Sequence, residues 1–389
     1  MKTLNKWIFC LYIIVTLTPI LSSCYIQMAL VVLWGLTIIP VFQYVEKDWK
    51  LFIFAWIGYA IILRVIGFST ASWGNYGIYV LFYYPLFVFA IYRHILNDKE
   101  KHCMVNFIMA VALLNMLYNI CFLIRHPGAN QELNFSDMYA GCNLGNSDFT
   151  FVIMLVLIIY LYYAIHGRII YFLAVVLGCF YLVISSKTTA LLVFLIITYI
   201  IFVEKFAAKI EKRQRILIEC LGIILPLLLY KPVLIVMSHF ISNQYIVERL
   251  NALIVGDTSS VYLSRAGLAK ISFHTFLNHP VLGIGYVKAD FSKIDYVTTG
   301  IGHHSEFIDH LGRYGLIGAV AYIFIWYNYF KTFNSYSGTK EDHYAGIMIF
   351  IAFMMYSLLN NSMDAMSGVV IFYLVSSVAD GDFGKKKYQ

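Results

Sequence analysis

The chain has 389 residues, of which 61% are hydrophobic and 13% are charged, and its mean hydropathy is +0.75. Soluble domains are about 25% charged and about 45–50% apolar, so this composition argues against a water-soluble protein and predicts a multi-span membrane protein. The net charge of +7 comes from Lys and Arg that lie mostly in short loops between apolar runs. There they orient membrane spans, and no nucleic-acid partner is expected.

About twelve apolar runs approach the roughly 20 residues that a helix needs to cross a bilayer. In chain order they are 7–22, 25–42, 51–67, 77–92, 104–124, 149–165, 169–184, 189–203, 216–236, 314–330, 344–359 and 366–379. The sequence therefore predicts an all-α fold, a polytopic transmembrane helix bundle, with residues 1–389 as a single integral membrane domain. With the N-terminus in the cytoplasm, most of the Lys and Arg fall on the inner side, as the positive-inside bias requires.

A long segment, residues 231–313, lies between the ninth and tenth predicted spans, on the outer face. Connections of this length within a compact domain are usually functional, so we expect this extracytoplasmic loop to form part of the active site. Within it, residues 264–277 predict a short amphipathic helix, which ends at Asn278-His279-Pro280 and the glycines that follow.

Charged residues are rare inside the predicted spans. Apart from Glu219, near the inner end of the ninth span, no span carries an Asp or Glu in its middle. Ion-coupled carriers keep ionisable groups at that depth, so such a carrier is disfavoured. Arg64 is the one clear intramembrane cation. Its side chain either extends to the interface or contacts a lipid phosphate.

The densest group of ionisable residues, Gly302 to Gly318, leads into the tenth predicted span. If this segment is helical, His303, Glu306, His310 and Arg313 share one stripe. Three histidines within eight residues admit a metal site, although the spacing is not that of a known zinc motif. A hydrogen-bonded interfacial cap is a second interpretation. The favoured third is acid/base chemistry, in which a histidine removes a proton from a hydroxyl near neutral pH.

Three short motifs resemble the O-antigen ligase and O-antigen polymerase superfamily. His304-Ser305, nine residues, Gly315, two residues and Gly318 match its His-[Asn/Ser/Gln]-x9-Gly-x-x-Gly pattern. The helix that begins near Arg265, followed by Pro280-Val281-Leu282-Gly283-Ile284-Gly285, is similar to the family's Arg-containing helix and Pro-x-x-Gly-x-Gly. Residues 185–191 resemble its Ser-Arg-Thr turn, with Lys187 in place of arginine; the charge is kept and the bidentate geometry is lost.

The resemblance implies a membrane glycosyltransferase without a cofactor, in the bacterial cytoplasmic membrane with its active site on the extracytoplasmic face. Its donor would be an oligosaccharide on undecaprenyl diphosphate. A polysaccharide repeat-unit polymerase, making O-antigen or capsule, is favoured; a ligase that transfers to a lipid-A core or a protein is the alternative, and a flippase or exporter of lipid-linked oligosaccharide is the second. Besides the donor, membrane lipids are expected partners, with a chain-length regulator and a flippase as further candidates.

Each step of such a transfer needs particular side chains. Cations must meet the charge that develops on the leaving diphosphate, and Arg265 is the first candidate. Lys187 is the other leading candidate, as a diphosphate-binding residue, and Arg249, Arg125 and Arg64 are the diphosphate-binding candidates behind these two. His304 is the candidate base for the acceptor hydroxyl, with Glu306 next. No Asp-x-Asp motif occurs in a predicted outer loop, so we expect metal-independent, inverting transfer.

Overall fold

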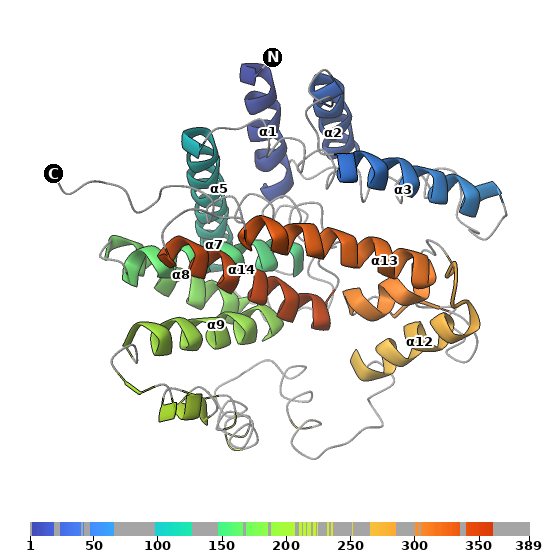
Figure 1. Cartoon of the computed structure of the whole chain (residues 1–389). Coiled ribbons are helices and arrows are strands. Elements are labelled where there is room, and N and C mark those ends of the chain that lie inside the picture. Colours follow the sequence, from blue (N-terminus) through green and yellow to red (C-terminus); the bar gives the residue numbers. More distant parts are fainter. Residues whose placement is uncertain are drawn as a thin grey trace.

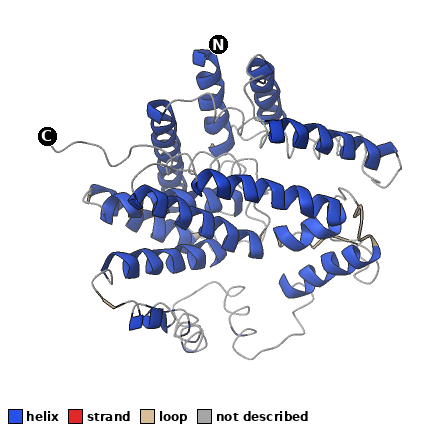
Figure 2. Cartoon of the chain, viewed as in Figure 1, coloured by secondary structure: helices blue, strands red, loops and turns tan. Residues whose placement is uncertain are grey.

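The computed structural model describes residues 2–18, 24–39, 42, 47–65, 98–126, 147–165, 169–185, 188–206, 265–284, 300–302, 305–334 and 340–360, with scattered positions between 210 and 251. Ten helices account for most of these residues: α1 (Lys2–Leu17), α2 (Cys24–Ile38), α3 (Lys47–Val65), α5 (Asp98–Arg125), α7 (Ser147–Ile165), α8 (Ile170–Ile184), α9 (Thr188–Phe206), α12 (Arg265–Asn278), α13 (Glu306–Asn334) and α14 (Lys340–Leu359). No strand occurs in the ranges just given (Figure 2), so the prediction of an all-α fold is confirmed there.

Each predicted span that falls on described residues coincides with one of these helices. Predicted spans 77–92 and 366–379 lie outside the described residues, and 216–236 lies mostly outside them. Within the described part of the chain, one helical stretch, Cys103–Phe122, has the length and apolar character needed to cross a membrane; it has 20 residues and a mean hydropathy of 1.8. Several shorter apolar helices accompany it, so twelve spans remain a prediction.

Helix α7 forms the centre of the core. Every residue from Phe149 to Tyr163 is buried, and the helix contacts α5, α8, α9 and α14. A helix that is apolar all round is stable only when it is covered on all sides, and α7 is covered by protein.

The helices around α7 present apolar side chains outward as well as inward. On α8, Tyr181 and Leu182 are buried, whereas Leu173 is 63% exposed and Phe180 is 54% exposed. Contiguous exposed apolar faces of this kind mark a surface that meets lipid or another protein.

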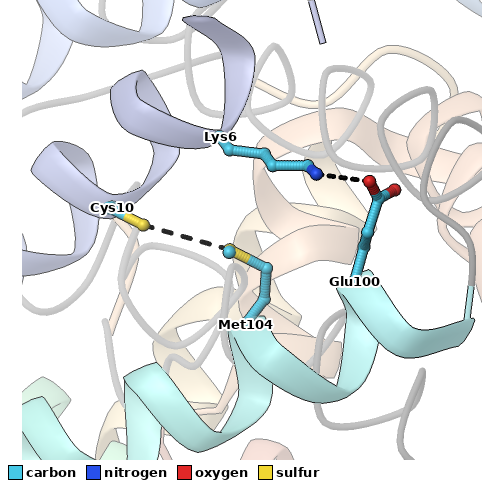
Figure 3. Close-up of polar contacts among 4 residues, drawn as sticks. All are labelled: Lys6, Cys10, Glu100 and Met104. Carbon is cyan, nitrogen blue, oxygen red and sulfur yellow. Dashed lines mark hydrogen bonds and ion pairs between the residues drawn. The ribbon is translucent and has the colours of Figure 1, made fainter. Parts of the chain in front are cut away.

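Neighbouring helices have defined relative directions. Lys6 forms an ion pair with Glu100, and one turn further along both helices Cys10 lies beside Met104 (Figure 3), so α1 and α5 run parallel. The predicted alternation of spans requires this, because the first and fifth spans cross in the same direction. Helices α7 and α8 are antiparallel. The ring of Tyr163 contacts the ring of Tyr171 at one end of the pair, and the ring of Phe149 contacts the ring of Tyr181 at the other.

The described helices do not share a single axis. In Figure 1, α9, α13 and α14 run across the view, whereas α1, α2 and α5 run up it. A simple bundle of near-parallel helices therefore does not describe this part of the chain. Helix α12 lies beside α13, at one end of the helices that run across the view, and this pair forms the site described next.

Candidate active site

Helix α12 occupies the position that the sequence predicts. It runs from Arg265 to Asn278, and a turn at His279–Leu282 follows it. Proline cannot continue a helix, and Pro280 accordingly stands two residues past the last helical residue. The predicted helix and its predicted end are both confirmed.

Helix α13 does not lead straight from the histidine motif into the tenth predicted span, as the sequence analysis expected. It breaks at Gly315, which has φ 61° and ψ −158°, into a first arm, 306–314, and a second arm, 316–334. The arms fold back on one another: Phe307 lies 5.4 Å from Tyr322 and 6.5 Å from Trp326 between ring centroids. The positive φ of Gly315 explains why the helix breaks at this residue, because glycine alone adopts that conformation without strain.

The turn after α12 fits into this break. Leu316 N donates to Pro280 O at 2.8 Å, and Ile284 N donates to Gly312 O at 3.2 Å. The first backbone amides of a helix have no acceptor within the helix. Carbonyl oxygens of the turn after α12 provide these acceptors for the second arm of α13. The structure therefore joins the two segments that carry the family-like glycine motifs.

Tyr59 of α3 ties this junction to the rest of the fold. Its hydroxyl oxygen lies 2.9 Å from the carbonyl oxygens of both Leu282 and Tyr314. One hydroxyl proton serves one carbonyl at a time, so the two oxygens share it. Sequence reasoning could not find Tyr59, because it lies more than 200 positions from both partners.

A buried carboxylate links the first arm of α13 to α12. Ser272 of α12 donates a hydrogen bond to Asp309 Oδ1, and Ser305 N donates to Asp309 Oδ2 at 3.2 Å. Ser272 Oγ also accepts a hydrogen bond from Gly302 N at 2.8 Å. One helical turn from Ser272, the Thr275 hydroxyl donates a hydrogen bond to Gly300 O and accepts one from Gly300 N. The segment before α13 is therefore anchored along α12.

Burial raises the pKa of Asp309 from 3.8 to about 6; hydrogen bonding from Ser272 and the charge of Arg313 oppose this rise. The side chain is 1% exposed. Desolvation of a carboxylate favours its neutral form, which accounts for the direction. Asp309 therefore changes protonation state in the mildly acidic range.

Three further ionisable side chains are buried in the first arm. His310 Nδ1 lies 3.3 Å from Glu306 Oε1 one helical turn away, and Arg313 is 2% exposed. This agrees with the expected stripe of Glu306, His310 and Arg313. A buried carboxylate beside an imidazole fixes the orientation of the ring.

An apolar cavity of about 470 Å³ opens beside His310. Residues of both arms of α13 and Met354 of α14 form its walls, and aromatic side chains such as Phe307, Tyr322 and Trp326 predominate. His310 is the one His, Lys, Arg, Asp or Glu among the residues that line it. The cavity is therefore suited to an apolar ligand.

The structure describes the predicted site residues unequally. Glu306 is 3% exposed and occupies the centre of the cluster. Arg265 is the first residue of α12, and Arg64 lies within α3, but their side chains are outside the described part. His304, Lys187 and Arg249 lie outside the described residues altogether.

Arg125 is the last residue of α5 and is exposed. Helix α5 packs on α1, α7 and α8, and a role of Arg125 in binding the diphosphate stays a prediction.

Asp309, His310, Arg313 and Ser272 were not among the predicted site residues. The i, i+4 spacing of Glu306 with His310, and of Asp309 with Arg313, is a signal that could have found three of them. Ser272 pairs with a residue 37 positions away, and no local pattern predicts such a pair.

Among the described residues, no group of three or more His, Cys, Asp and Glu side chains could hold a metal ion. His303 and His304, on which the metal interpretation depended, lie outside those residues. No protein-family model matches the sequence, and no curated protein matches it either.

Proposed function

We propose that the chain is a membrane glycosyltransferase, and specifically a polysaccharide repeat-unit polymerase that uses an oligosaccharide on undecaprenyl diphosphate. The observation that carries this proposal is the junction of the two motif segments. Gly283 of Pro-x-x-Gly-x-Gly and Gly315 of the histidine motif both have positive φ. A Cβ built on Gly315 would lie 2.8 Å from Gly283 N. Two motifs that resemble one family in sequence thus meet in space at the residues that define them.

The anchoring of residues 300–302 supports a functional pairing of His304 with Arg265. Gly300 is bonded to Thr275 and packs against Ile271, whereas Gly302 is bonded to Ser272 and contacts Leu268. The segment therefore proceeds toward the N-terminal end of α12, where Arg265 begins the helix. His304 follows two residues after Gly302.

The proposed reaction transfers a glycan from one lipid carrier to the next repeat. An acceptor hydroxyl attacks the anomeric carbon of the donor, His304 takes its proton, and the bond from that carbon to the diphosphate oxygen breaks with inversion. Arg265, with Lys187, meets the charge on the departing lipid diphosphate. The buried Glu306–His310 pair and Arg313 provide a fixed polar environment for this step.

The apolar features of the fold support a membrane setting for this chemistry. The cavity beside His310 suits part of an isoprenoid chain whose head group lies near the polar cluster. The exposed apolar faces of α8 and of the second arm of α13, including Val320 and Ile323, suit contact with lipid. An enzyme that acts on a lipid-linked glycan requires both.

Reconstitution in nanodiscs tests the proposal. The purified protein, given lipid-linked repeats alone, should produce longer lipid-linked glycans. His304→Ala and Arg265→Ala should each lower the rate of chain growth by about a hundredfold or more. His274→Ala and Lys270→Ala are matched controls on the exposed positions of α12 and should leave the rate unchanged. Chain growth that persists in both site variants would overturn the assignment.

The same assay distinguishes the other activities. A ligase would form product only when a core acceptor is added, and an exporter would move lipid-linked sugar without forming a glycosidic bond. At position 187, Lys187→Arg should retain activity and Lys187→Ala should lose it, because a charge at that position is expected to stabilise the leaving diphosphate.

A further inference from the structure

Two backbone amides, one on either side of the His303-His304 pair, donate hydrogen bonds to side chains and not to backbone carbonyls of a helix or strand. Gly302 N donates to Ser272 Oγ, and Ser305 N donates to Asp309 Oδ2. Ser272 Oγ donates in turn to Asp309 Oδ1. One carboxylate therefore fixes both flanks of the pair, one directly and the other through a hydroxyl.

This arrangement is enclosed by close packing. Ser272 is 0% exposed, and a Cβ on Gly312 would lie 2.8 Å from Ser272 O. A Cβ on Gly302 would collide with the backbone of Leu268. The two glycines thus allow the segment and the first arm of α13 to approach α12 closely. In such a buried setting an unmade hydrogen bond is costly, so the bonds to Asp309 define one geometry.

We infer that Asp309 is a positioning residue: directly at Ser305 and through Ser272 at Gly302, it fixes the two backbone positions that flank the His303-His304 pair and so supports the proposed role of His304 as the base. This inference depends on the proposed function for the role of His304. The bonds of Asp309 lead to the backbone of Ser305 and to Ser272, so its contribution is the position of these two flanks. Misplacement of a catalytic group by about 1 Å can cost about a hundredfold in rate, which gives such a residue a large effect.

The first test measures the backbone directly, by hydrogen–deuterium exchange of the full-length protein in nanodiscs. Ser272→Ala removes the acceptor of Gly302 N and should speed exchange within residues 300–305 about fivefold. Ser357→Ala is a matched control, because Ser357 is also a 0% exposed helical serine; it should leave exchange in 300–305 unchanged. Unchanged exchange in Ser272→Ala would overturn the inference whatever the activity of the protein.

The second test measures chain growth. Asp309→Ala and Ser272→Ala should lower kcat by about ten- to a hundredfold with little change in KM, because the base is displaced while substrate contacts remain. Asp309→Asn should recover most of the kcat lost in Asp309→Ala, since its amide can accept from Ser305 N and donate to Ser272 Oγ. A raised KM with normal kcat, or no recovery in Asp309→Asn, would overturn the positioning role.

These two tests separate the possible failures. If Asp309→Ala does not fold, Ser272→Ala, the smaller change, carries both measurements. A wild-type protein that binds lipid-linked repeats and never extends them contradicts the proposed function and, with it, the catalytic role of Asp309. A wild-type protein that extends glycans while Ser272→Ala matches it in kcat contradicts the positioning role alone.

Discussion

Gly283 and Gly315 face each other across the junction of two chain segments, both with positive φ, at 65° and 61°. A Cβ on either would enter the backbone of the opposing segment. This pair explains why two glycine motifs occur together although their facing glycines lie 32 positions apart in the sequence. The turn after α12 completes the start of the second arm of α13, and neither segment has room for a side chain there.

Gly283→Ala and Gly315→Ala should each destabilise the protein by about 2 kcal/mol or more, since strain at positive φ adds to a collision with backbone. Thermal unfolding in detergent would measure the loss. Gly58→Ala is the matched control: Gly58 lies within α3 with nothing within 4 Å of its Cβ position, so alanine there should be neutral or slightly stabilising. Equal melting temperatures for Gly315→Ala and Gly58→Ala would contradict the described junction.

Tyr59→Phe should lower stability by about 1 kcal/mol, because it removes the hydroxyl shared by the carbonyl oxygens of Leu282 and Tyr314 and keeps the ring. Ring contacts with Trp56 should remain. Tyr25, which is 85% exposed, provides the control Tyr25→Phe. The comparison uses melting temperatures under one set of detergent conditions, and a loss in Tyr59→Phe no larger than in the control would show that the hydroxyl does not tie α3 to the junction.

The Glu306–His310 pair should behave as one unit. Its two side chains are 3% and 4% exposed, with Nδ1 and Oε1 3.3 Å apart. A double-mutant cycle with Glu306→Gln and His310→Ala, measured as the free energy of unfolding, should give a coupling free energy of about 1.5–3 kcal/mol. This is the range for a hydrogen bond to a charged group. Additive losses would indicate that the pair does not interact.

The titration of Asp309 should appear in the pH dependence of stability. Its pKa is raised to about 6 in the folded protein from 3.8, so its stabilising contribution is complete below the lower value and is lost as the pH rises through 6. This difference corresponds to about 3 kcal/mol. The melting temperature of the wild type, relative to Asp309→Asn, should therefore fall between pH 4.5 and pH 7.5. A relative melting temperature that rises over this range would refute the assigned direction.

The sequence predicts some parts of this structure well for definite physical reasons. The span of α12 followed from apolar spacing and from Pro280, which are local signals. The break at Gly315 was missed, although the glycine itself was noted. A helical pattern of side chains on both sides hides a reversal that depends on a partner turn more than 30 positions away, at 279–282. The bonds among Ser272, Gly302 and Asp309 were likewise beyond reach, since hydroxyl and carboxylate partners at such separation leave no periodic pattern.

The outward apolar face of α8 allows a direct test of the membrane setting. Val176 is 50% exposed near the middle of this helix, and Phe180 is 54% exposed one turn further along. On a soluble protein, lysine at either position would be neutral or would improve solubility. In a bilayer, Val176→Lys should cost about 2.5–3.5 kcal/mol and reduce the protein recovered from the membrane fraction. Ile170→Lys, at the first residue of α8, should cost much less, because a lysine at a helix end reaches the interface. Membrane recovery and melting temperature that are unchanged in Val176→Lys would mean that this face does not meet lipid.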